Sequence, residues 1–268
     1  MKHPLLPTRN AALPSVPLGM CAAPAIYTPT AAAYCEQLSI DGFAIVPGVL
    51  GPTEIAGLLI SLENLGESDS IRKRGGIFAV RNLLDVSPQV RALAESPRVR
   101  EIVASILGAQ AFPVRGILFD KTPDANWKVP WHQDLTIAVA EKKEVDGFGP
   151  WSTKAGVLHV QPPAQVLENM LSIRIHLDPC GADNGALKVI PRSHCHGRIG
   201  ETDIAQIVSE NSIAVCAVEA GDALLMRPLL LHASSASATP VHRRVVHIDF
   251  AASKLPDGLK WMSEMATV

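Results

Sequence analysis

Residues 130–135 read PWHQDL, which places His132 and Asp134 two positions apart directly after a proline. The same His-x-Asp spacing occurs twice more along the chain, at His176 and Asp178 and at His247 and Asp249. In a strand, residues i and i+2 share a face, so each pair could aim an imidazole and a carboxylate at one point. With a second histidine, such a pair forms a triad that binds Fe(II) and leaves coordination positions open.

Chain order separates the three pairs. In a closed antiparallel sandwich, a distal histidine must follow its partner pair after several strands. No histidine follows His247, and few strands fit between His176 and His232, whereas three strands and an insertion fit between His132 and His232. Any one pair could be a chance match among nine histidines, and a histidine beside small residues is more often exposed. The preference for His132, Asp134 and His232 therefore rests on their combination.

The composition is that of an ordinary globular protein. Of the 268 residues, 47% are hydrophobic and 19% charged, and the formal net charge is -2, which gives no sign of nucleic-acid or membrane binding. The absence of internal repeats and linkers favours a single domain spanning residues 1–268. Residues 1–26 are proline-rich and predict an irregular arm rather than a signal peptide. Five cysteines without a CxxC motif predict reduced thiols and a cytoplasmic location.

The first part of the chain predicts helices and the rest predicts strands. Three helices are expected: from Thr28-Pro29 to about Leu38, from Thr53 over an apolar face at 55, 58, 59 and 62, and from Ser96-Pro97 to Gly108. Strands are expected in FAIVPGVL (43–50), VRGILF (114–119), LSIRIHL (171–177), ALKVI (186–190), SIAVCAV (212–218), DALLMRPLLLH (222–232) and RRVVHIDFA (243–251). Because no helical crossovers fit between these runs, they favour an antiparallel sandwich or barrel.

Residues 141–170 interrupt the strand pattern. The segment EKKEVDGFGPWSTKAGVLHVQPP (141–163) has weak periodicity and lies between two strands. A long insertion in a compact domain is often functional, so we expect an active-site lid. Within it, His159, Gln161 and Trp151 are the candidate substrate contacts.

Two arginines are candidates for binding a carboxylate. Arg243 begins a strand eleven residues after His232, where its guanidinium could fork onto the far carboxylate of a keto-diacid bound to the metal. Arg244 should then face the opposite side of that strand. Arg174, His176 and Asp178 are expected to share one strand face, and a charge inside a barrel needs a partner. Arg174 is therefore a candidate for binding a carboxylate of a cosubstrate or of a substrate; the alternative is an outward face on which all three side chains are solvated.

The chain resembles the phytanoyl-CoA dioxygenase family of Fe(II)- and 2-oxoglutarate-dependent oxygenases. The residues that carry the resemblance appear in family order: DGFAIVPGVL (41–50), ILFDKTPDANWKVPWHQDL (117–135), ADNGALKVIPRSH (182–194), GDALLMRPLLLHASSAS (221–237) and HRRVVHIDFA (242–251). The resemblance implies a mainly β fold with packed helices, whose core is a double-stranded β-helix, the cupin-like jelly roll. The helices belong to the N-terminal part.

The resemblance also implies roles for individual residues. His132, Asp134 and His232 hold Fe(II), and the His-x-Asp of HIDFA is then incidental. The residues implied to contact 2-oxoglutarate are Arg243, Ser234, Arg174, Lys121 and Ile117. Asp134 argues for oxygenation, because halogenating relatives carry a small residue there. Two departures are Arg192, which replaces a turn glycine in PRSH, and HASSAS, which lacks a later asparagine of the family.

The implied activity is a dioxygenase that uses O2 to hydroxylate, desaturate or cyclise a small organic substrate, releasing succinate and CO2. Arg174, Lys121 and the insertion favour a carboxylate-bearing substrate. One alternative keeps the fold but not the cosubstrate, as in a cupin-like metal enzyme. A second alternative is a non-catalytic jelly-roll binding module.

Overall fold

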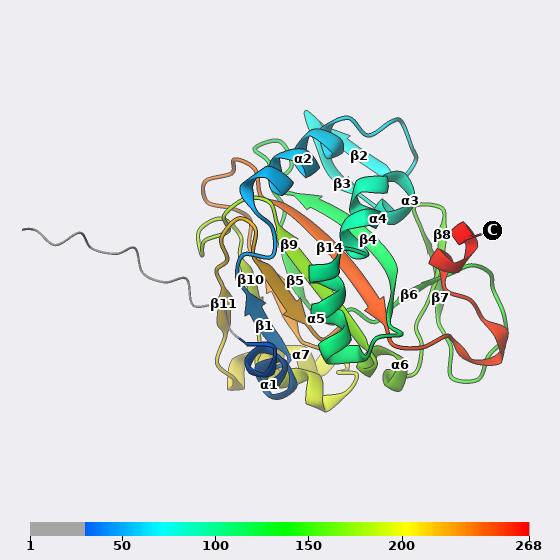
Figure 1. Ribbon diagram of the computed structural model, residues 1–268. Helices are drawn as coiled ribbons and strands as arrows, with labels where there is room; N and C mark the ends of the chain where they lie inside the picture. The colour runs from blue at the N-terminus through cyan, green and yellow to red at the C-terminus, as the bar shows by residue number, and fades with distance from the viewer. Residues whose placement is uncertain (1–29, 268) are drawn as a thin grey trace, which may run out of the picture.

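The computed structural model describes residues 30–267 (Figure 1). The predicted irregular arm at 1–26 and the predicted cap at Thr28-Pro29 lie outside the described residues. Three antiparallel sheets form the β part of the molecule. Helices pack on the outside of the largest sheet, and Figure 1 shows α5 crossing in front of β9 and β14.

The largest sheet has seven strands. In spatial order they are β1 (Phe43–Val46), β12 (Ala223–Met226), β9 (Met170–His176), β14 (Arg244–Ala251), β4 (Phe112–Asp120), β3 (Gly76–Val80) and β2 (Ile71–Arg74). The four-stranded sheet has the order β11 (Ala214–Cys216), β10 (Leu187–Val189), β13 (His232–Ser234) and β5 (Val129–His132). The three-stranded sheet has the order β6 (Ile137–Val139), β8 (Val157–Val160) and β7 (Trp151–Lys154).

The helices lie mainly before β4 in the chain. The α-helices are α1 (Ala31–Asp41), α2 (Pro52–Glu63), α3 (Leu83–Val86), α4 (Pro88–Ala94), α5 (Pro97–Leu107), α6 (Ala164–Glu168) and α7 (Glu201–Glu210). Three 3-10 helices follow at η1 (Ser193–His196), η2 (Pro256–Gly258) and η3 (Met262–Thr267). The predicted helical N-terminal part is thus confirmed over the described residues.

Two of the three predicted helices begin at a different residue from the one predicted. Helix α5 begins as predicted, with Ser96 as its N-cap. Helix α1 is capped by Thr30, whose side chain accepts a hydrogen bond from the backbone N–H of Ala33. Helix α2 is capped by Gly51, so Thr53 lies inside its first turn. The reason is Pro52: a proline is favoured at the first helical position, and it moves the start two residues earlier than the threonine suggests.

Alternation along the central strands sorts side chains into two environments. On β9, Leu171, Ile173 and Ile175 pack into the core beneath the helices, whereas Ser172 and Arg174 point to the other face, toward the four-stranded sheet. Strand β14 alternates in the same way. Both faces are therefore covered, which explains why nearly every residue of these two strands is buried.

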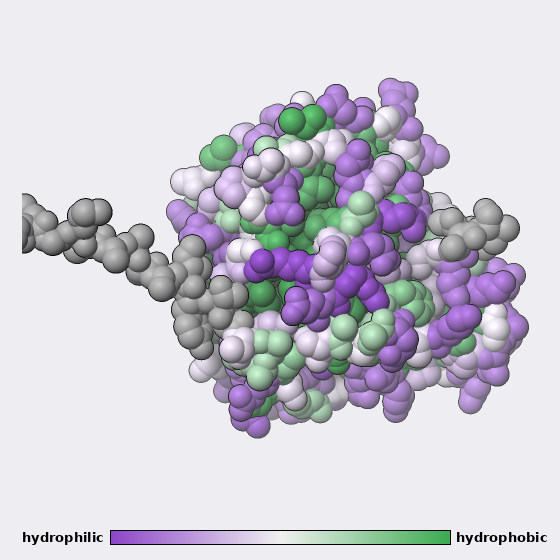
Figure 2. Space-filling view, in the orientation of Figure 1, coloured by the Kyte–Doolittle hydropathy of each residue, from purple (hydrophilic) through white to green (hydrophobic). Residues whose placement is uncertain are grey.

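A second hydrophobic cluster joins the two large sheets face to face. Leu187 and Val189 of β10 pack there against Leu224 and Met226 of β12. Two antiparallel sheets packed over a shared core agree with the predicted jelly roll, and the fold prediction is confirmed. On the side of the molecule that carries the helices, hydrophilic residues are spread over the surface, with hydrophobic residues showing between them (Figure 2). No helix within residues 30–267 is long and apolar enough to cross a membrane.

Two predicted strands are wrong in detail. The run DALLMRPLLLH forms β12 only as far as Met226, and a turn follows before β13 begins at His232. Pro228 has no N–H to give to a ladder, so a continuous strand through it is disfavoured. FAIVPGVL likewise forms a strand only as far as Val46, because Pro47 and Gly48 turn the chain.

The insertion at 141–170 is more ordered than its weak periodicity suggested. It contains the β7–β8 hairpin and helix α6, and β8 pairs with β6. A separate hydrophobic cluster, which includes the buried Trp261, holds this small sheet against the C-terminal segment. Its function as a lid remains a prediction.

Candidate active site

Three side chains converge at the end of β5 and the start of β13. One ligand atom from each of His132, Asp134 and His232 lies within 4.8 Å of the others. His232 Nε2 is 3.8 Å and His132 Nε2 is 3.9 Å from the carboxylate oxygens of Asp134. Two imidazoles and one carboxylate in this arrangement match the donor set that holds Fe(II) in non-haem oxygenases.

Strand pairing brings the two histidines together. His132 and His232 are opposite each other in the β5–β13 register, and their rings are 4.2 Å apart between centroids. Strand β5 ends at His132, so Asp134 is placed by the following loop and not by strand alternation, which corrects the sequence argument. The backbone N–H of Asp134 donates to the Pro228 carbonyl at 2.9 Å, because the turn that contains this proline lies beside the loop.

Gln133 fixes the loop between the two ligands. Its side-chain amide nitrogen donates to the Leu229 and Gly197 carbonyls, and its oxygen accepts from the N–H of Ile199. The buried amide therefore points away from the ligand cluster and anchors the segment on both sides. The middle residue of the His-x-Asp motif is thus structural.

Hydrogen bonds define the tautomer of both histidines. Nδ1 of His132 is 2.9 Å from the Pro130 carbonyl, and Nδ1 of His232 is 2.8 Å from the Leu230 carbonyl. A carbonyl can only accept, so each Nδ1 carries the proton and each Nε2 presents its lone pair toward Asp134. Burial lowers the pKa of His232 to about 4, partly offset by Asp134. At neutral pH it is therefore an uncharged imidazole, the form that binds a metal.

A second cluster surrounds Arg243. One of its terminal nitrogens donates to the Gly185 carbonyl at 2.8 Å, and its backbone N–H donates to Asp120. Its Nε is buried and has no hydrogen-bond partner within residues 30–267. A buried guanidinium with an unused donor fits the carboxylate of a diacid such as 2-oxoglutarate.

Lys121 and Ser234 belong to the same cluster. Lys121 is fully buried, and its ammonium donates to the Ser234 hydroxyl at 3.1 Å and to the Ser235 carbonyl. The Ser234 hydroxyl accepts this bond and keeps its own hydrogen for a ligand. Burial, followed by the nearby Arg243, lowers the pKa of Lys121 to about 8.

Arg174 is connected to the pair that the sequence argument set aside. Arg174 Nη1 donates to His247 Nδ1 at 2.9 Å, so His247 carries its proton on Nε2 and donates it to Asp249 at 2.8 Å. His247 is not one of the converging ligands, yet it lines the same cavity. Asp178 lies beyond the end of β9 and pairs with Arg244 at 2.7 Å. The expectation that it shares a face with Arg174 is wrong, because strand alternation stops at His176.

The cavity that contains the triad measures about 210 Å³, which suits a small ligand. Among the residues implied by the resemblance, Arg174, Arg243, Ser234 and Ile117 line it, together with the three metal-ligand candidates. Sequence reasoning missed several other lining residues: Arg81, Arg115, Phe119, Trp127, Val129, Leu187 and Ala233. Arg115 and Phe119 lie two residues before and two residues after Ile117 on β4. The three side chains therefore share one face, and strand periodicity could have identified the two missed residues.

The candidate substrate contacts of the insertion do not line this cavity. His159 is buried, and its Nδ1 lies 3.0 Å from the Val157 carbonyl. Burial lowers its pKa to about 4. Trp151 stacks with the ammonium of Lys142, and Gln161 pairs with Gly149 and Pro150 through its backbone. Their contact with substrate stays a prediction.

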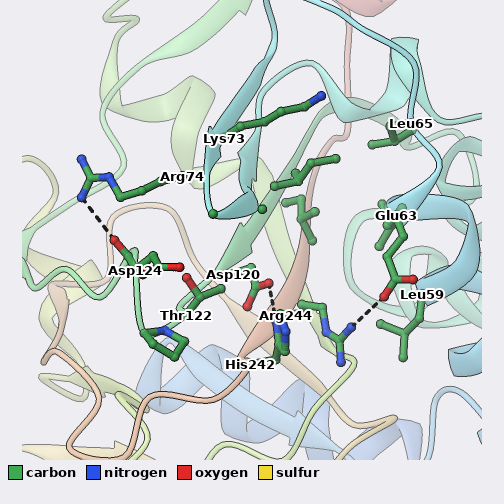
Figure 3. A pocket seen from close by; sticks show the side chains of 16 residues that line it. Leu59, Glu63, Leu65, Lys73, Arg74, Asp120, Thr122, Asp124, His242 and Arg244 are labelled. Atoms are coloured by element: carbon green, nitrogen blue, oxygen red, sulfur yellow. Dashed lines mark hydrogen bonds and ion pairs between the residues drawn. The ribbon is translucent and has the colours of Figure 1, made fainter.

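A second cavity, of about 500 Å³, lies on the other side of β4 and β14 (Figure 3). Arg244 lines it, which confirms that this residue faces away from Arg243. Arg244 pairs there with Glu63 and with Asp178, and His242 pairs with Asp120 at 2.7 Å. Arg244 and His242 are therefore matched by carboxylates, whereas Lys73 and Arg74, which also line this cavity, have no ion-pair partner within residues 30–267.

The sequence as a whole matches one protein family. The match to phytanoyl-CoA dioxygenase (PhyH) covers residues 38–245. The chain belongs to the phytanoyl-CoA dioxygenase family. A search of the curated proteins returned no match. The family match confirms the resemblance seen in the sequence and places the chain among the Fe(II)- and 2-oxoglutarate-dependent oxygenases.

Several solved structures have a fold similar to that of this chain. AviO1 from Streptomyces viridochromogenes Tue57 is 24% identical, with 86% of this chain and 97% of that chain covered and a TM-score of 0.62. EctD from S. alaskensis with 2-oxoglutarate and 5-hydroxyectoine is 20% identical, with 86% and 79% covered and a TM-score of 0.65. The α-ketoglutarate-dependent epimerase SnoN from nogalamycin biosynthesis is 20% identical, with 82% and 80% covered and a TM-score of 0.61.

Proposed function

We propose that this phytanoyl-CoA dioxygenase family member hydroxylates a small organic substrate with Fe(II), 2-oxoglutarate and O2, releasing succinate and CO2. Desaturation and ring closure start from removal of the same hydrogen atom and are variants of one activity. The observation that carries the proposal is the convergence of His132, Asp134 and His232 within 4.8 Å in a cavity that Arg243 also lines.

In this proposal the chain fills only some of the metal's coordination positions. His132, Asp134 and His232 are three protein ligands, which leaves positions for the cosubstrate and for O2. The Nδ1–H bonds to the Pro130 and Leu230 carbonyls orient both rings before metal binds. When bound, iron and 2-oxoglutarate would activate O2, the oxidant that breaks a substrate C–H bond, and 2-oxoglutarate would be oxidised to succinate and CO2.

The cosubstrate's far carboxylate is assigned to Arg243, Ser234 and Lys121. The support is the unused Nε donor of Arg243, the free hydroxyl hydrogen of Ser234 and the buried ammonium of Lys121 beside it. A charge-assisted bidentate contact of this kind is stronger than a neutral hydrogen bond. Arg174 also has an unused buried Nε, so it is placed to bind a carboxylate of the cosubstrate or of the substrate.

The test is spectroscopic and anaerobic. Fe(II) and 2-oxoglutarate are added to metal-free protein, and the visible spectrum is recorded for wild type, Arg243→Ala and His132→Ala. We expect a weak charge-transfer band from keto-acid chelated to iron, which both variants lose. Arg98→Ala and His196→Ala, at exposed positions on α5 and η1, serve as matched controls and should keep the band.

The outcomes separate the rival activities. A folded, iron-loaded wild type without the band would overturn the proposal and favour a cupin-like enzyme that does not use 2-oxoglutarate. Failure of the wild type to bind iron at all would favour a non-catalytic binding module. A band in the wild type justifies a substrate screen by succinate release.

A further inference from the structure

Two arginines line the cavity beside the metal-ligand candidates, and a lysine of the insertion contacts the same threonine, Thr136, as one of them. Arg81 follows directly after β3, Arg115 lies on β4, and Lys154 is the last residue of β7 in the insertion. Arg81 and Arg115 line the cavity together with His132 and Asp134. Neither arginine belongs to the group around Arg243 that the cosubstrate would occupy.

Arg115 and Lys154 both reach Thr136: Arg115 Nη1 donates to its backbone carbonyl at 3.5 Å, and Lys154 Nζ donates to its hydroxyl at 2.9 Å. Burial lowers the pKa of Lys154, and the charges of Arg115 and Arg81 lower it further. Burial and the charge of Arg115 also lower the pKa of Arg81. Grouping like charges in a partly buried place costs free energy unless an opposite charge joins them.

The protein itself supplies little of that opposite charge. Within residues 30–267, the Arg81 guanidinium has neither a hydrogen-bond nor an ion-pair partner, and Lys154 donates only to the neutral Thr136 hydroxyl at 2.9 Å. Arg115 Nε lies 3.6 Å from Asp249 Oδ2. Asp249 is shared, since its Oδ1 already accepts from His247 and from Ser172.

The neighbouring cavity on the other side of β4 and β14 provides a contrast. There Arg244 and His242 each have a carboxylate partner, as Figure 3 shows with dashed lines to Glu63 and Asp120. Arg244 and His242 are thus each paired on one face of the sheet, whereas Arg81 has no carboxylate partner within residues 30–267 and Arg115 shares Asp249 with His247. Arg81 and Arg115 lie on the face of the metal-ligand candidates.

Binding of Fe(II) and 2-oxoglutarate would not remove the excess of positive charge in the cavity. Fe(II) and the 2-oxoglutarate dianion carry equal and opposite charges, so adding both leaves the balance unchanged. Four arginines line the cavity, while Asp134 and Asp249 are the carboxylates that face them. The remaining positive charge favours a ligand with negative charge of its own.

We propose that Arg81, Arg115 and Lys154 form a subsite for an anionic group of the substrate, either a carboxylate or a phosphate or sulfate ester. Guanidinium groups bind these anions in a bidentate way, and Lys154 adds a point charge from the insertion. The inference rests on the proposed function for the occupancy of the rest of the cavity. It gives the insertion a role through Lys154 rather than through Trp151 or His159.

The test uses small probes on the loaded protein. The full chain is kept anaerobic with Fe(II) and saturating 2-oxoglutarate, so that the metal and Arg243 are already engaged. Acetate, its neutral isostere acetamide, and sulfate as a tetrahedral dianion are titrated by calorimetry at constant ionic strength. We expect acetate or sulfate to bind and acetamide not to bind. The preferred anion identifies a carboxylate or an ester dianion as the substrate group.

Substitutions at the proposed subsite test whether the anion binds there. Arg81→Gln and Lys154→Gln should each weaken binding of the preferred anion about tenfold or more, because each removes a charged hydrogen-bond donor. Arg81→Lys should recover part of the loss. Arg98→Gln removes the same charge from an exposed position on α5 and should bind the anion like wild type.

Two results would overturn the subsite. One is equal binding of acetate and acetamide, or no binding of either anion, by a protein that shows the charge-transfer band. The other is an unchanged anion affinity in Arg81→Gln and Lys154→Gln. Because the band is recorded on the same samples, loss of the proposed function is distinguished from loss of the subsite: Arg81→Gln should keep the band while losing the anion.

Discussion

Lys121 should make cosubstrate binding depend on pH. Its buried ammonium has a pKa of about 8 in the cosubstrate-free protein, set by burial and by Arg243. A bound carboxylate favours the charged form, so 2-oxoglutarate affinity should be level below pH 8. Above pH 8 the lysine must first take up a proton, and affinity should fall by up to about tenfold per pH unit. Titration of the charge-transfer band at several pH values measures this.

The matched variant for that experiment is Lys121→Met, which keeps the length of the side chain and removes its charge. It should bind 2-oxoglutarate more weakly than wild type below pH 8 and show a flat profile above it. A wild-type profile that stays flat to pH 9.5 would contradict a role for the ammonium in binding.

Arg192, which by the resemblance replaces a turn glycine, stores backbone strain. Its φ is 68°, in the left-handed region that costs a non-glycine residue about 1–2 kcal/mol. Arg192→Gly should therefore stabilise the protein by about 0.5–1 kcal/mol, after the larger entropy of glycine in the unfolded chain is subtracted. Urea unfolding measures the change. Arg198→Gly, an exposed loop position without positive φ, should instead destabilise it slightly.

At the scale of elements, Gly185 controls the approach of the segment before β10 to the cosubstrate group. Its φ is +67°, and a Cβ there would lie 2.8 Å from the Ser235 carbonyl oxygen and 3.0 Å from Lys121 Nζ. Gly185→Ala should cost about 2 kcal/mol of unfolding free energy and weaken 2-oxoglutarate binding, because Lys121 and Arg243 both bond around this point. Unfolding and the charge-transfer titration measure the two effects.

The control for this change is Gly57→Ala, in the middle of α2, where an added Cβ meets nothing within 4 Å. It should raise stability by about 0.5–1 kcal/mol and leave cosubstrate binding unchanged. A Gly185→Ala protein with wild-type affinity would show that the backbone at this point does not position the cosubstrate group.

The elements differ in how far the sequence could predict them. Strands β9 and β14 were predictable because apolar residues, several of them β-branched, recur along a full strand length. The pairing of His132 with His232 depends on which strands meet in space, so chain order could favour it but not establish it. Arg81 follows a short strand with no alternation of its own, and its place in the cavity comes only from the pairing of β3 with β4. No local pattern marks it.

At the scale of the whole molecule, two of the hydrophobic cores support different parts of the site. The larger core lies between the helices and the seven-stranded sheet, behind Arg174 on β9 and behind β14, the strand that follows Arg243. The smaller core holds the three-stranded sheet of the insertion, and Trp261 from the C-terminal segment is buried in it at 1% exposure. Lys154 lies on β7 of the sheet that this smaller core holds.

Trp261→Ala tests whether the smaller core can be weakened without weakening the larger one. Loss of a buried tryptophan costs about 3–5 kcal/mol, and that loss should fall mainly on the smaller core. Hydrogen exchange should speed up across residues 141–170, while β9 and β14 keep wild-type protection. The charge-transfer band should survive, and anion binding at the Lys154 subsite should weaken. Ile60→Ala, a 63% exposed position on α2, is the control. Equal acceleration of exchange in β9 and in the insertion would mean that the two cores unfold as one unit, and the insertion could then not open as a lid while the metal site stays intact.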